Sequence, residues 1–394
     1  MIKIADKSHC CACMACAQIC PKACIDIVED EEGFLYPKVN QTECINCGLC
    51  ESVCQFLSNN ENAHPIQIYA SKNKNDTERL KSSSGGIFSI LANNVLEKNG
   101  VVFGARFDTD FSVVHDFIEK KEDLNKLVGS KYLQSKVMDS FRNVKKFLQD
   151  DRIVLFSGTP CQILGLKKFL KRDYENLFCV DVVCHGAPSP KIWKEYLKTE
   201  GLCASKNISF RDKSSGWKNY SISFKSDKKT LLSQIFHKNL YMRGFLRDLY
   251  LRPSCYNCAA KNGKSQSDIT LGDFWGVQHI LPNFDDDKGV SLVLINTEKG
   301  KLLFDNTNTN NIEVSYANVL QHNRAIEDSA IRPPNREKFW KLYQEIGLKK
   351  AIQSETKIPL VKRIKNDIGL YGRICIRRLF GDTLYNKLKL RLKK

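Results

Sequence analysis

Hydrophobic residues recur along this chain with two alternating periods. In some segments apolar side chains stand three and four positions apart, which predicts helices, and between them lie short apolar runs typical of strands. Helices are predicted over 82–100, 139–149, 161–172 and 190–199, and strands over 101–107, 113–118, 153–156 and 177–183. Strands that alternate with helices predict an α/β domain whose sheet is covered on both faces. The runs 208–210 and 220–224 predict an antiparallel addition, so we expect a mixed sheet.

In the first 60 residues, the most regular pattern is the spacing of cysteines and not the spacing of hydrophobic residues. The spacing C-x2-C-x2-C-x3-C occurs twice in them. Three closely spaced thiolates can bind three irons of one 4Fe-4S cubane, and in a doubled motif each remote fourth cysteine serves the other cluster. We therefore assign cluster one to Cys10, Cys13, Cys16 and Cys54, and cluster two to Cys20, Cys44, Cys47 and Cys50.

The stretch between the two motifs predicts a hairpin, with strands over 25–28 and 34–39. That arrangement matches the bacterial-type ferredoxin fold. The alternative, a pair of zinc sites, would use sets of C-x2-C pairs. Pro21 follows the first motif, whereas Gln55 stands at the corresponding position after the second.

Composition divides the chain into three parts. The polar stretch 57–66 predicts a linker, and fourteen Lys and Arg against three acidic residues make 349–394 strongly basic. We predict a ferredoxin domain over 1–60, a larger domain over 61–348 that holds the remaining candidate sites, and a basic amphipathic helical tail over 349–394. The predicted fold class is therefore α+β and α/β: a small bacterial-type ferredoxin domain, a larger mixed-sheet domain and the tail.

Length and charge exclude several classes of protein. With 394 residues and 42% hydrophobic content, the chain is not disordered throughout. No apolar run approaches the roughly 18 residues that span a bilayer, and the N-terminus has no signal-peptide pattern, so we expect a cytoplasmic protein with reduced cysteines. The net charge of +17 is unevenly distributed: residues 1–60 hold four lysines against eight acidic residues and carry −4, whereas the middle carries +10 and the tail +11. Nucleic-acid binding is disfavoured, because no aromatic-basic interleaving accompanies the charge.

Four more cysteines are placed in the middle of the chain. Cys161 and Cys184 follow predicted strands, at the sheet edge where open α/β folds bind ligands, and Cys255 and Cys258 form a C-x2-C pair. Cys161 also begins a predicted helix, whose amide dipoles stabilise a thiolate. Spacing alone leaves a third cluster, a zinc site and unrelated cysteines open.

A phosphate site is predicted where the helix over 82–100 begins. The bare amides of Ser84, Gly85 and Gly86 can approach an oxyanion, and Lys131 can supply a cation. An ordinary helix cap and a surface lysine are the alternatives. The chain has neither G-x-G-x-x-G nor a Walker loop, so a standard Rossmann site is not supported.

Six motifs together carry a resemblance to a known family. SSSGGIFSIL, GSKYLQS, FSGTPCQILGLKKFL, VDVVCHGAPSP, RPSCYNCAAK and SDITLGDFWGV follow the ferredoxin head in this order. They resemble the family formed by the beta subunits of coenzyme F-420 hydrogenases and dehydrogenases over about residues 1–300. Members of that family pass electrons between iron-sulfur clusters, FAD and an organic acceptor, which is a deazaflavin in archaeal hydrogenases and a pigment in plant hydroxymethyl-chlorophyll reductases.

The resemblance implies site residues. It assigns Cys161, Cys184, Cys255 and Cys258 as ligands of a third 4Fe-4S cluster. It also favours FAD near the helix start at 84–86, Lys131 and the turn formed by Gly158, Thr159 and Pro160. No catalytic acid or base is assigned.

We therefore expect an oxidoreductase that relays electrons from a low-potential, ferredoxin-type donor through 4Fe-4S clusters to FAD and an organic small molecule. Deazaflavin F-420 is one candidate acceptor. Bacterial relatives with the same head are often associated with surface polysaccharide synthesis, which makes a sugar-linked substrate an expectation. The alternative function is a non-enzymatic adaptor that delivers electrons to a partner reductase. The acidic head favours a donor with a basic patch.

The tail has its own expectation. Apolar residues 361, 364, 368, 371, 375 and 379 fall at helical spacing among basic residues. One interpretation is peripheral binding to the anionic inner face of the cell membrane, and the other is packing on the body.

Overall fold

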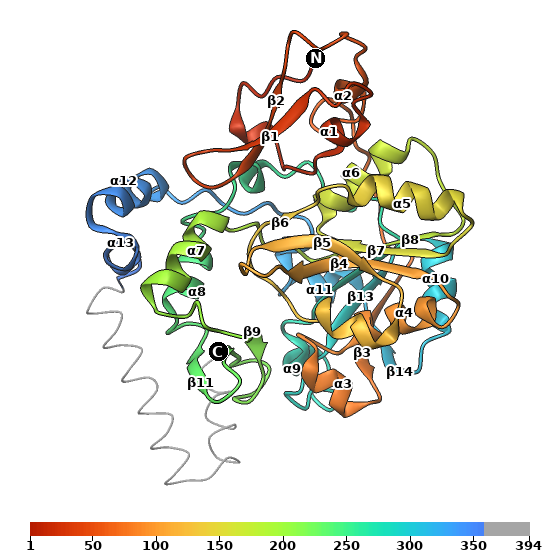
Figure 1. Ribbon diagram of the computed structural model, residues 1–394. Coiled ribbons are helices and arrows are strands. Elements are labelled where there is room, and N and C mark those ends of the chain that lie inside the picture. Colours follow the sequence, from red (N-terminus) through yellow and green to blue (C-terminus); the bar gives the residue numbers. More distant parts are fainter. Residues whose placement is uncertain (358–394) are drawn as a thin grey trace.

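A nine-stranded mixed sheet forms the centre of the body in the computed structural model, which describes residues 1–357 (Figure 1). Its strands lie in the order β14-β3-β13-β12-β8-β7-β4-β5-β6. They are β3 (Gln67–Asn73), β4 (Val101–Phe107), β5 (Val113–Ile118), β6 (Ser135–Lys136), β7 (Val154–Gly158), β8 (Leu177–Val182), β12 (Ile269–Asp273), β13 (Ser291–Ile295) and β14 (Thr309–Glu313). The central strands β4, β7, β8 and β12 are parallel, whereas β13, β3, β14 and β5 pair antiparallel with their neighbours, apart from the parallel β5–β6 pair. The predicted mixed sheet is confirmed.

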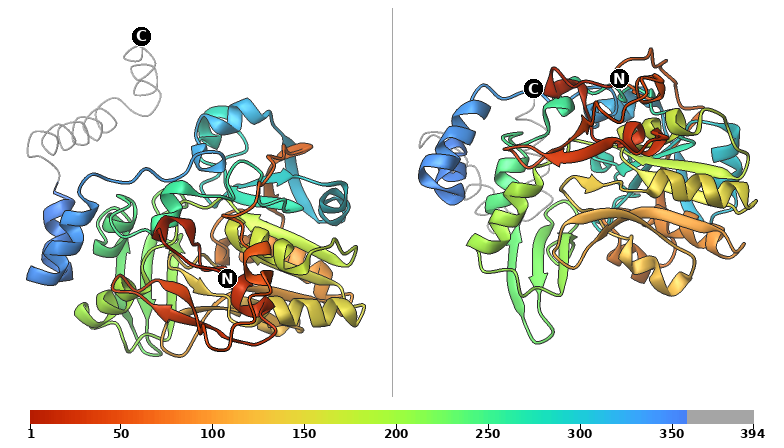
Figure 2. Two further views of the ribbon diagram at one scale, coloured as in Figure 1. Left: turned by 90° about the horizontal axis from the view of Figure 1, so that it is seen from above. Right: turned by 45° about the horizontal axis from the view of Figure 1, so that its top comes forward.

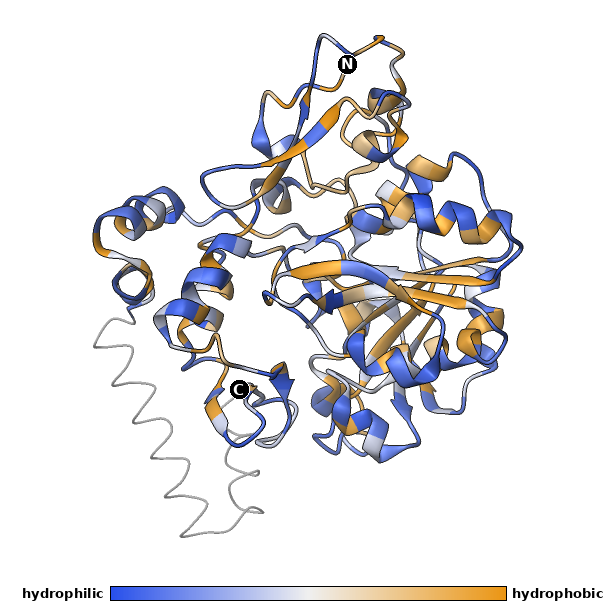
Figure 3. Ribbon diagram, viewed as in Figure 1, coloured by the Kyte–Doolittle hydropathy of each residue, from blue (hydrophilic) through white to orange (hydrophobic). Residues whose placement is uncertain are grey.

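Helices cover both faces of this sheet. The helices are α3 (Asp76–Lys81), α4 (Ile87–Leu96), α5 (Ser140–Gln149), α6 (Pro160–Leu170) and α10 (Glu298–Asp305). Alternate residues of β4 point to opposite faces, so Phe103 packs in one buried cluster with α5 and α6, and Val102 packs in another with α4 and α10. Figure 3 shows hydrophobic residues running along the central strands, as expected for a sheet buried on both sides.

The predicted antiparallel addition is wrong in its placement. The strands β9 (Asn207–Asp212), β10 (Ser221–Lys225) and β11 (Thr230–Ile235) are antiparallel, but they form a separate sheet in the order β11-β10-β9. The reason is the partner of their apolar side chains. Phe210 and Phe224 pack around Trp193 of α7 (Pro190–Thr199), with ring centroids 5.0 and 6.0 Å from that of Trp193.

The head contains a hairpin and two short helices. They are β1 (Ile25–Glu29), β2 (Leu35–Val39), α1 (Ala15–Ile19) and α2 (Leu49–Ser52). The head lies against α5 and α6 of the body (Figure 2). A Cβ on Gly165 of α6 would stand 2.7 Å from the Cβ of Cys13, so glycine allows this close approach. Residues 57–66 contain no helix or strand; the domain boundaries remain predictions.

The C-terminal helices of the described part pack on the body. They are α8 (Leu240–Phe245), α12 (Arg336–Ile346) and α13 (Leu348–Glu355), and Leu348, Ala351 and Ile352 of α13 are buried. The remaining elements are η1 (Lys7–His9), η2 (Lys121–Lys126), η3 (Pro253–Asn257), α9 (Val277–Ile280), α11 (Tyr316–Leu320) and η4 (Arg324–Ile326). The predicted amphipathic helix from residue 360 onward lies outside the described residues. Within residues 1–357, no helix has the length and apolar character needed to cross a membrane.

Candidate iron-sulfur and flavin sites

The two cysteine loops of the head share one backbone conformation. In the first loop Ala12 and Met14 have φ of 54° and 61°, and at the corresponding positions of the second loop Asn46 and Gly48 have φ of 51° and 74°. Three of these four residues are not glycine, so the left-handed conformation is costly and must be held by its surroundings. The repeated turns wrap each C-x2-C-x2-C segment tightly.

The first wrapped loop gathers the four cysteines assigned to cluster one. Cys10, Cys13, Cys16 and Cys54 lie close enough together that, in every pair, the charge of one thiolate affects the pKa of the other. Backbone amides donate to their sulfurs, for example that of Ala12 to Cys10. Burial raises the pKa of Cys10 and Cys16. A bound metal cluster would reverse that effect, because coordination deprotonates a thiol.

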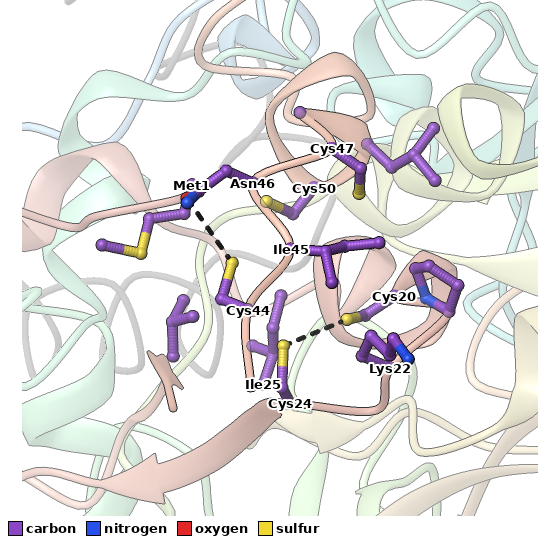
Figure 4. Close-up of a pocket in the computed structure, with 14 residues that line it drawn as sticks. Met1, Cys20, Lys22, Cys24, Ile25, Cys44, Ile45, Asn46, Cys47 and Cys50 are labelled. Carbon is purple, nitrogen blue, oxygen red and sulfur yellow. Dashed lines mark hydrogen bonds between the residues drawn. The ribbon is translucent and has the colours of Figure 1, made fainter. Parts of the chain in front are cut away.

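The four cysteines assigned to cluster two line one small hollow (Figure 4). Cys20 comes from the end of α1, and Cys44, Cys47 and Cys50 come from the second loop. Cys24, which falls outside the motif, lines the same hollow, and its Sγ lies 3.5 Å from that of Cys20. Cys47 is exposed, so this site lies at the surface of the head.

The third set comes from three separate segments of the body. Cys161 lies in the first turn of α6, Cys184 follows β8, and Cys255 and Cys258 lie in and after η3. In every pair of these four thiols, the charge of one affects the pKa of the other. The amide of Ala187 donates to Cys255 Sγ at 3.2 Å. The chain thus brings together four cysteines up to 97 positions apart in the sequence.

Cys11 and Gln55 join the first set to the third. Gln55 is 1% exposed, and its Nε2 donates to Cys11 Sγ at 3.2 Å and to the carbonyl of Cys161 at 2.9 Å. Hydrogen bonds with Cys13 and Cys161 raise the pKa of Cys11 well above its usual range, and the Cys11 thiol lowers the pKa of Cys161 to about 7. Cys11 therefore lies between Cys13 of the first set and Cys161 of the third.

Two buried cations face these thiols without a carboxylate partner in the described part of the chain. Arg252 is 1% exposed and donates to the carbonyls of Cys10 (2.6 Å) and Leu35 (2.9 Å) and to Gln134 Oε1 (3.1 Å). Its charge acts on both Cys10 and Cys161. Lys261 is 7% exposed and donates to the carbonyl of Cys184. Buried charges require compensation, which anionic thiolate-bound clusters would supply, so the residues present fit such groups.

The predicted phosphate cradle is partly engaged by the protein itself. The Ser84 hydroxyl donates to the carbonyl of Val290 and the Gly85 amide to Ser291 Oγ, both at 2.9 Å. A Cβ on Gly85 would stand 2.4 Å from the carbonyl oxygen of Ser71, so this glycine serves packing between strands. Gly86, with φ of 84°, begins α4 without any side-chain cap, which leaves the amides of the first turn for another acceptor.

Lys131 lies beside the same segment and beside a buried polar network. The amide of Ser130 donates to Ser83 Oγ at 2.8 Å, and burial lowers the pKa of Lys131 to about 7. The Lys131 amine donates only to backbone carbonyls within the described residues. The Lys131 charge acts on His115, whose ring lies 3.0 Å from the carbonyl of Ser157.

The turn of Gly158, Thr159 and Pro160 connects that network to the third cysteine set. Gln162 Oε1 accepts from the Thr159 amide at 2.9 Å, and Thr159 Oγ1 lies 3.2 Å from Cys161 Sγ. A residue predicted to contact flavin and a predicted cluster ligand are therefore direct neighbours.

Several of these side chains were not selected from the sequence. They are Cys11, Gln55, His115, Arg252 and Lys261. Arg252 had a usable signal, because an arginine three residues before a C-x2-C pair suggests charge compensation. The others depend on contacts between distant segments.

Comparisons with known proteins agree with this geometry. Residues 151–318 match the family described as the C terminus of the beta subunit of coenzyme F420 hydrogenase/dehydrogenase, and residues 37–57 match the 4Fe-4S binding domain. The chain is 30% identical over 208 residues to the coenzyme F420-dependent sulfite reductase of Methanocaldococcus jannaschii, covering 50% of this chain and 30% of that protein. It is 24% identical over 207 residues to the F subunit of the F(420)H(2) dehydrogenase of Methanosarcina mazei, covering 48% of this chain and 58% of that protein.

A solved structure of the F420-reducing NiFe hydrogenase complex from Methanosarcina barkeri, derivatised with xenon, is similar at a TM-score of 0.46 and 16% identity. The similarity covers 75% of this chain and 92% of that one. The chain thus spans less than two thirds of the length of the curated relatives that it matches. With the ferredoxin motifs and the third cysteine set in place, the chain is similar over residues 151–318 to the C-terminal part of the coenzyme F420 hydrogenase/dehydrogenase beta subunits, and over residues 37–57 to the 4Fe-4S binding domain.

Proposed function

We propose that this protein is an iron-sulfur flavoprotein oxidoreductase with three 4Fe-4S clusters and one FAD. The single observation that carries the proposal is the junction at Cys11, which contacts a ligand of cluster one and a ligand of cluster three. Electron transfer requires close approach of the centres, and this junction supplies it between head and body. The order would run from cluster two at the surface of the head to cluster one, and then to cluster three.

We assign a cluster rather than zinc to the third set because the region that matches the beta-subunit family, residues 151–318, contains all four of its cysteines. A zinc ion takes four donors that converge on one point at about 2.3 Å, whereas a cubane takes one thiolate on each of several irons. The iron and zinc contents of the purified protein distinguish the two.

FAD would be held beside cluster three. The uncapped start of α4 at Gly86 and the partly buried Lys131 would bind its phosphates, and the turn at Gly158 and Thr159 would lie between it and Cys161. A flavin supplies exchange between one-electron and two-electron transfer. Lys131 contributes its charge at the phosphates, and the Thr159 turn orients the segment that carries Cys161.

The organic partner would be coenzyme F420, because the names of both curated relatives include it. The link to surface polysaccharide synthesis rests on the family resemblance alone. One relative is named as part of a multi-subunit dehydrogenase, which favours a second form of the proposal, in which the chain delivers electrons to a partner reductase. Reduction of purified F420 by the isolated, dithionite-reduced chain separates the two forms: turnover supports the enzyme, and its absence with clusters and flavin intact supports the adaptor.

Anaerobic purification with iron, sulfide and flavin analysis tests the cofactors. Three cubanes would contain about twelve irons per chain, and the proposal adds one FAD per chain. About eight irons with one zinc would refute the third cluster.

The ligands of the third set are tested by Cys161→Ala, which should remove about four irons and leave the spectrum of the head clusters intact. Cys179→Ala is the matched control, because Cys179 is a buried cysteine of β8 outside all three sets. An unchanged iron content in Cys161→Ala would exclude that ligand.

A further inference from the structure

A groove between the head and the body opens beside cluster two. It is lined on the head side by residues 18–21 and on the body side by Phe169 of α6 and the exposed face of α5. None of the residues that line it is acidic. Figure 2 shows the same two segments side by side in both views.

The body side of the groove is basic. Arg142, Lys145 and Lys146 all line it. Arg142 is fixed in place, since its Nε donates to the carbonyl of Gln18 at 2.8 Å and its NH1 lies 3.1 Å from Asp139. Lys145 and Lys146 form no ion pair with any residue of the described part. Two uncompensated positive charges therefore face this opening.

The groove also reaches a predicted cluster ligand. Cys20 and Pro21 line both this groove and the hollow of cluster two. A protein seated in the groove would thus contact Cys20 itself, a residue that also lines the hollow of cluster two. The buried ring of Phe169 adds an apolar contact beneath the charged rim.

We propose that this groove is the docking site of an acidic electron-carrier protein that reduces cluster two beside Cys20. The inference rests on the proposed function and specifies its donor. In each encounter the carrier is oxidised by one electron and the chain is reduced by one, and no covalent bond is made or broken. The acidic head taken alone favours a donor with a basic patch, but the charged residues that line the groove with Cys20 are Arg142, Lys145 and Lys146, all of which lie on α5 of the body.

The experiment measures reduction of the cluster-loaded chain by stopped-flow absorbance, with a dithionite-reduced, acidic two-cluster ferredoxin as the probe. The variant is Lys145→Glu with Lys146→Glu. At low ionic strength we expect its second-order rate constant to fall at least about tenfold, because charge steering raises association rates by about 10 to 1,000 times. Added salt should slow the unchanged chain but not the variant, because salt screens both the attraction to the lysines and the repulsion by the glutamates.

Two controls isolate the groove. Lys228→Glu with Lys229→Glu carries the same change of charge on exposed lysines in the turn between β10 and β11, and it should keep its rate. Reduction by dithionite alone should be equal in all three chains, which shows that folding and clusters are intact. Equal ferredoxin rates in both double variants, or a faster rate in the groove variant, would overturn the docking site. No reduction of the unchanged chain by dithionite would instead overturn the proposed function.

Discussion

Replacing Arg252 by methionine removes one positive charge between the first and third cysteine sets while keeping most of the side-chain volume. The guanidinium makes three hydrogen bonds, two of which hold backbone carbonyls of the head. Hydrogen bonds to charged groups contribute about 1.5–3 kcal/mol each, so the loss is about 5 kcal/mol in the cluster-loaded chain. In a cluster-free chain the same arginine is a buried cation without a carboxylate, so methionine also removes an unfavourable charge and the loss should be smaller.

The electrostatic effect has a definite sign. Reduction adds a negative charge to a cluster, and a nearby cation favours it. For unit charges about 6 Å apart at an effective dielectric constant of 20 the interaction is about 3 kcal/mol. Since 1.4 kcal/mol corresponds to about 59 mV for one electron, we expect the midpoint potentials of clusters one and three to fall by about 100 mV. Cluster two should keep its potential and serves as an internal reference.

Potentiometric titration followed by electron paramagnetic resonance measures these shifts, and thermal unfolding of loaded and chelator-treated chains measures stability. Arg79→Met is the matched control, because Arg79 is 2% exposed but is paired with Asp286 through two hydrogen bonds. It should destabilise the chain without moving any potential. Unchanged potentials in Arg252→Met, or equal shifts in both variants, would refute the view that Arg252 compensates the clusters.

Three further predictions concern the site and the tail. Cys11→Ala should keep the full iron content, because Cys11 is a hydrogen-bond donor and not a ligand, and should lower the potentials of clusters one and three; loss of about four irons would make it a ligand. Burial lowers the pKa of Lys131 to about 7, below its value in the unfolded chain, so the unfolded chain binds more protons above pH 7. The free energy of unfolding should therefore rise by about 4 kcal/mol between about pH 7 and pH 10, and chemical denaturation should detect this rise in the unchanged chain but not in Lys131→Met. A chain truncated after Lys357, which keeps the packed helix α13, should no longer float with anionic vesicles if the tail is the membrane contact, and undiminished flotation would exclude it.

Local signals predicted the hairpin of the head, the strands β4, β5, β7 and β8 and the helices α4 to α7, but none of the described elements after β10. The strands over 101–107 and 113–118 have those bounds in the structure, and helix α7 begins and ends at the predicted residues. Period and capping are properties of neighbouring residues, so they can be read from a short window. The separate sheet of β9 to β11 could not be predicted in this way, because its placement depends on Trp193, which comes from a different segment.

The candidate site also has features that depend on neighbouring residues, which could be predicted, and features that depend on distant segments, which could not. Regular spacing indicated the eight cysteines of the head, and both C-x2-C-x2-C segments have the same turns in the structure; the role of these cysteines as ligands stays a prediction. The link between head and body was not predicted, since Gln55 was only a departure from proline in the sequence. Its side chain becomes informative once the fold brings Cys11 and Cys161 together.

Helix α6 contacts both cysteine sets with one face. Cys161 in its first turn belongs to the third set, and Gly165, four residues later on the same face, lies against Cys13 of the first. The spacing between these two centres is therefore set by the rise of one rigid helix. The linker at 57–66 does not set it, so insertions there should be tolerated without lengthening the tunnelling distance, whereas a single residue inserted between 161 and 165 would rotate one centre away from the other.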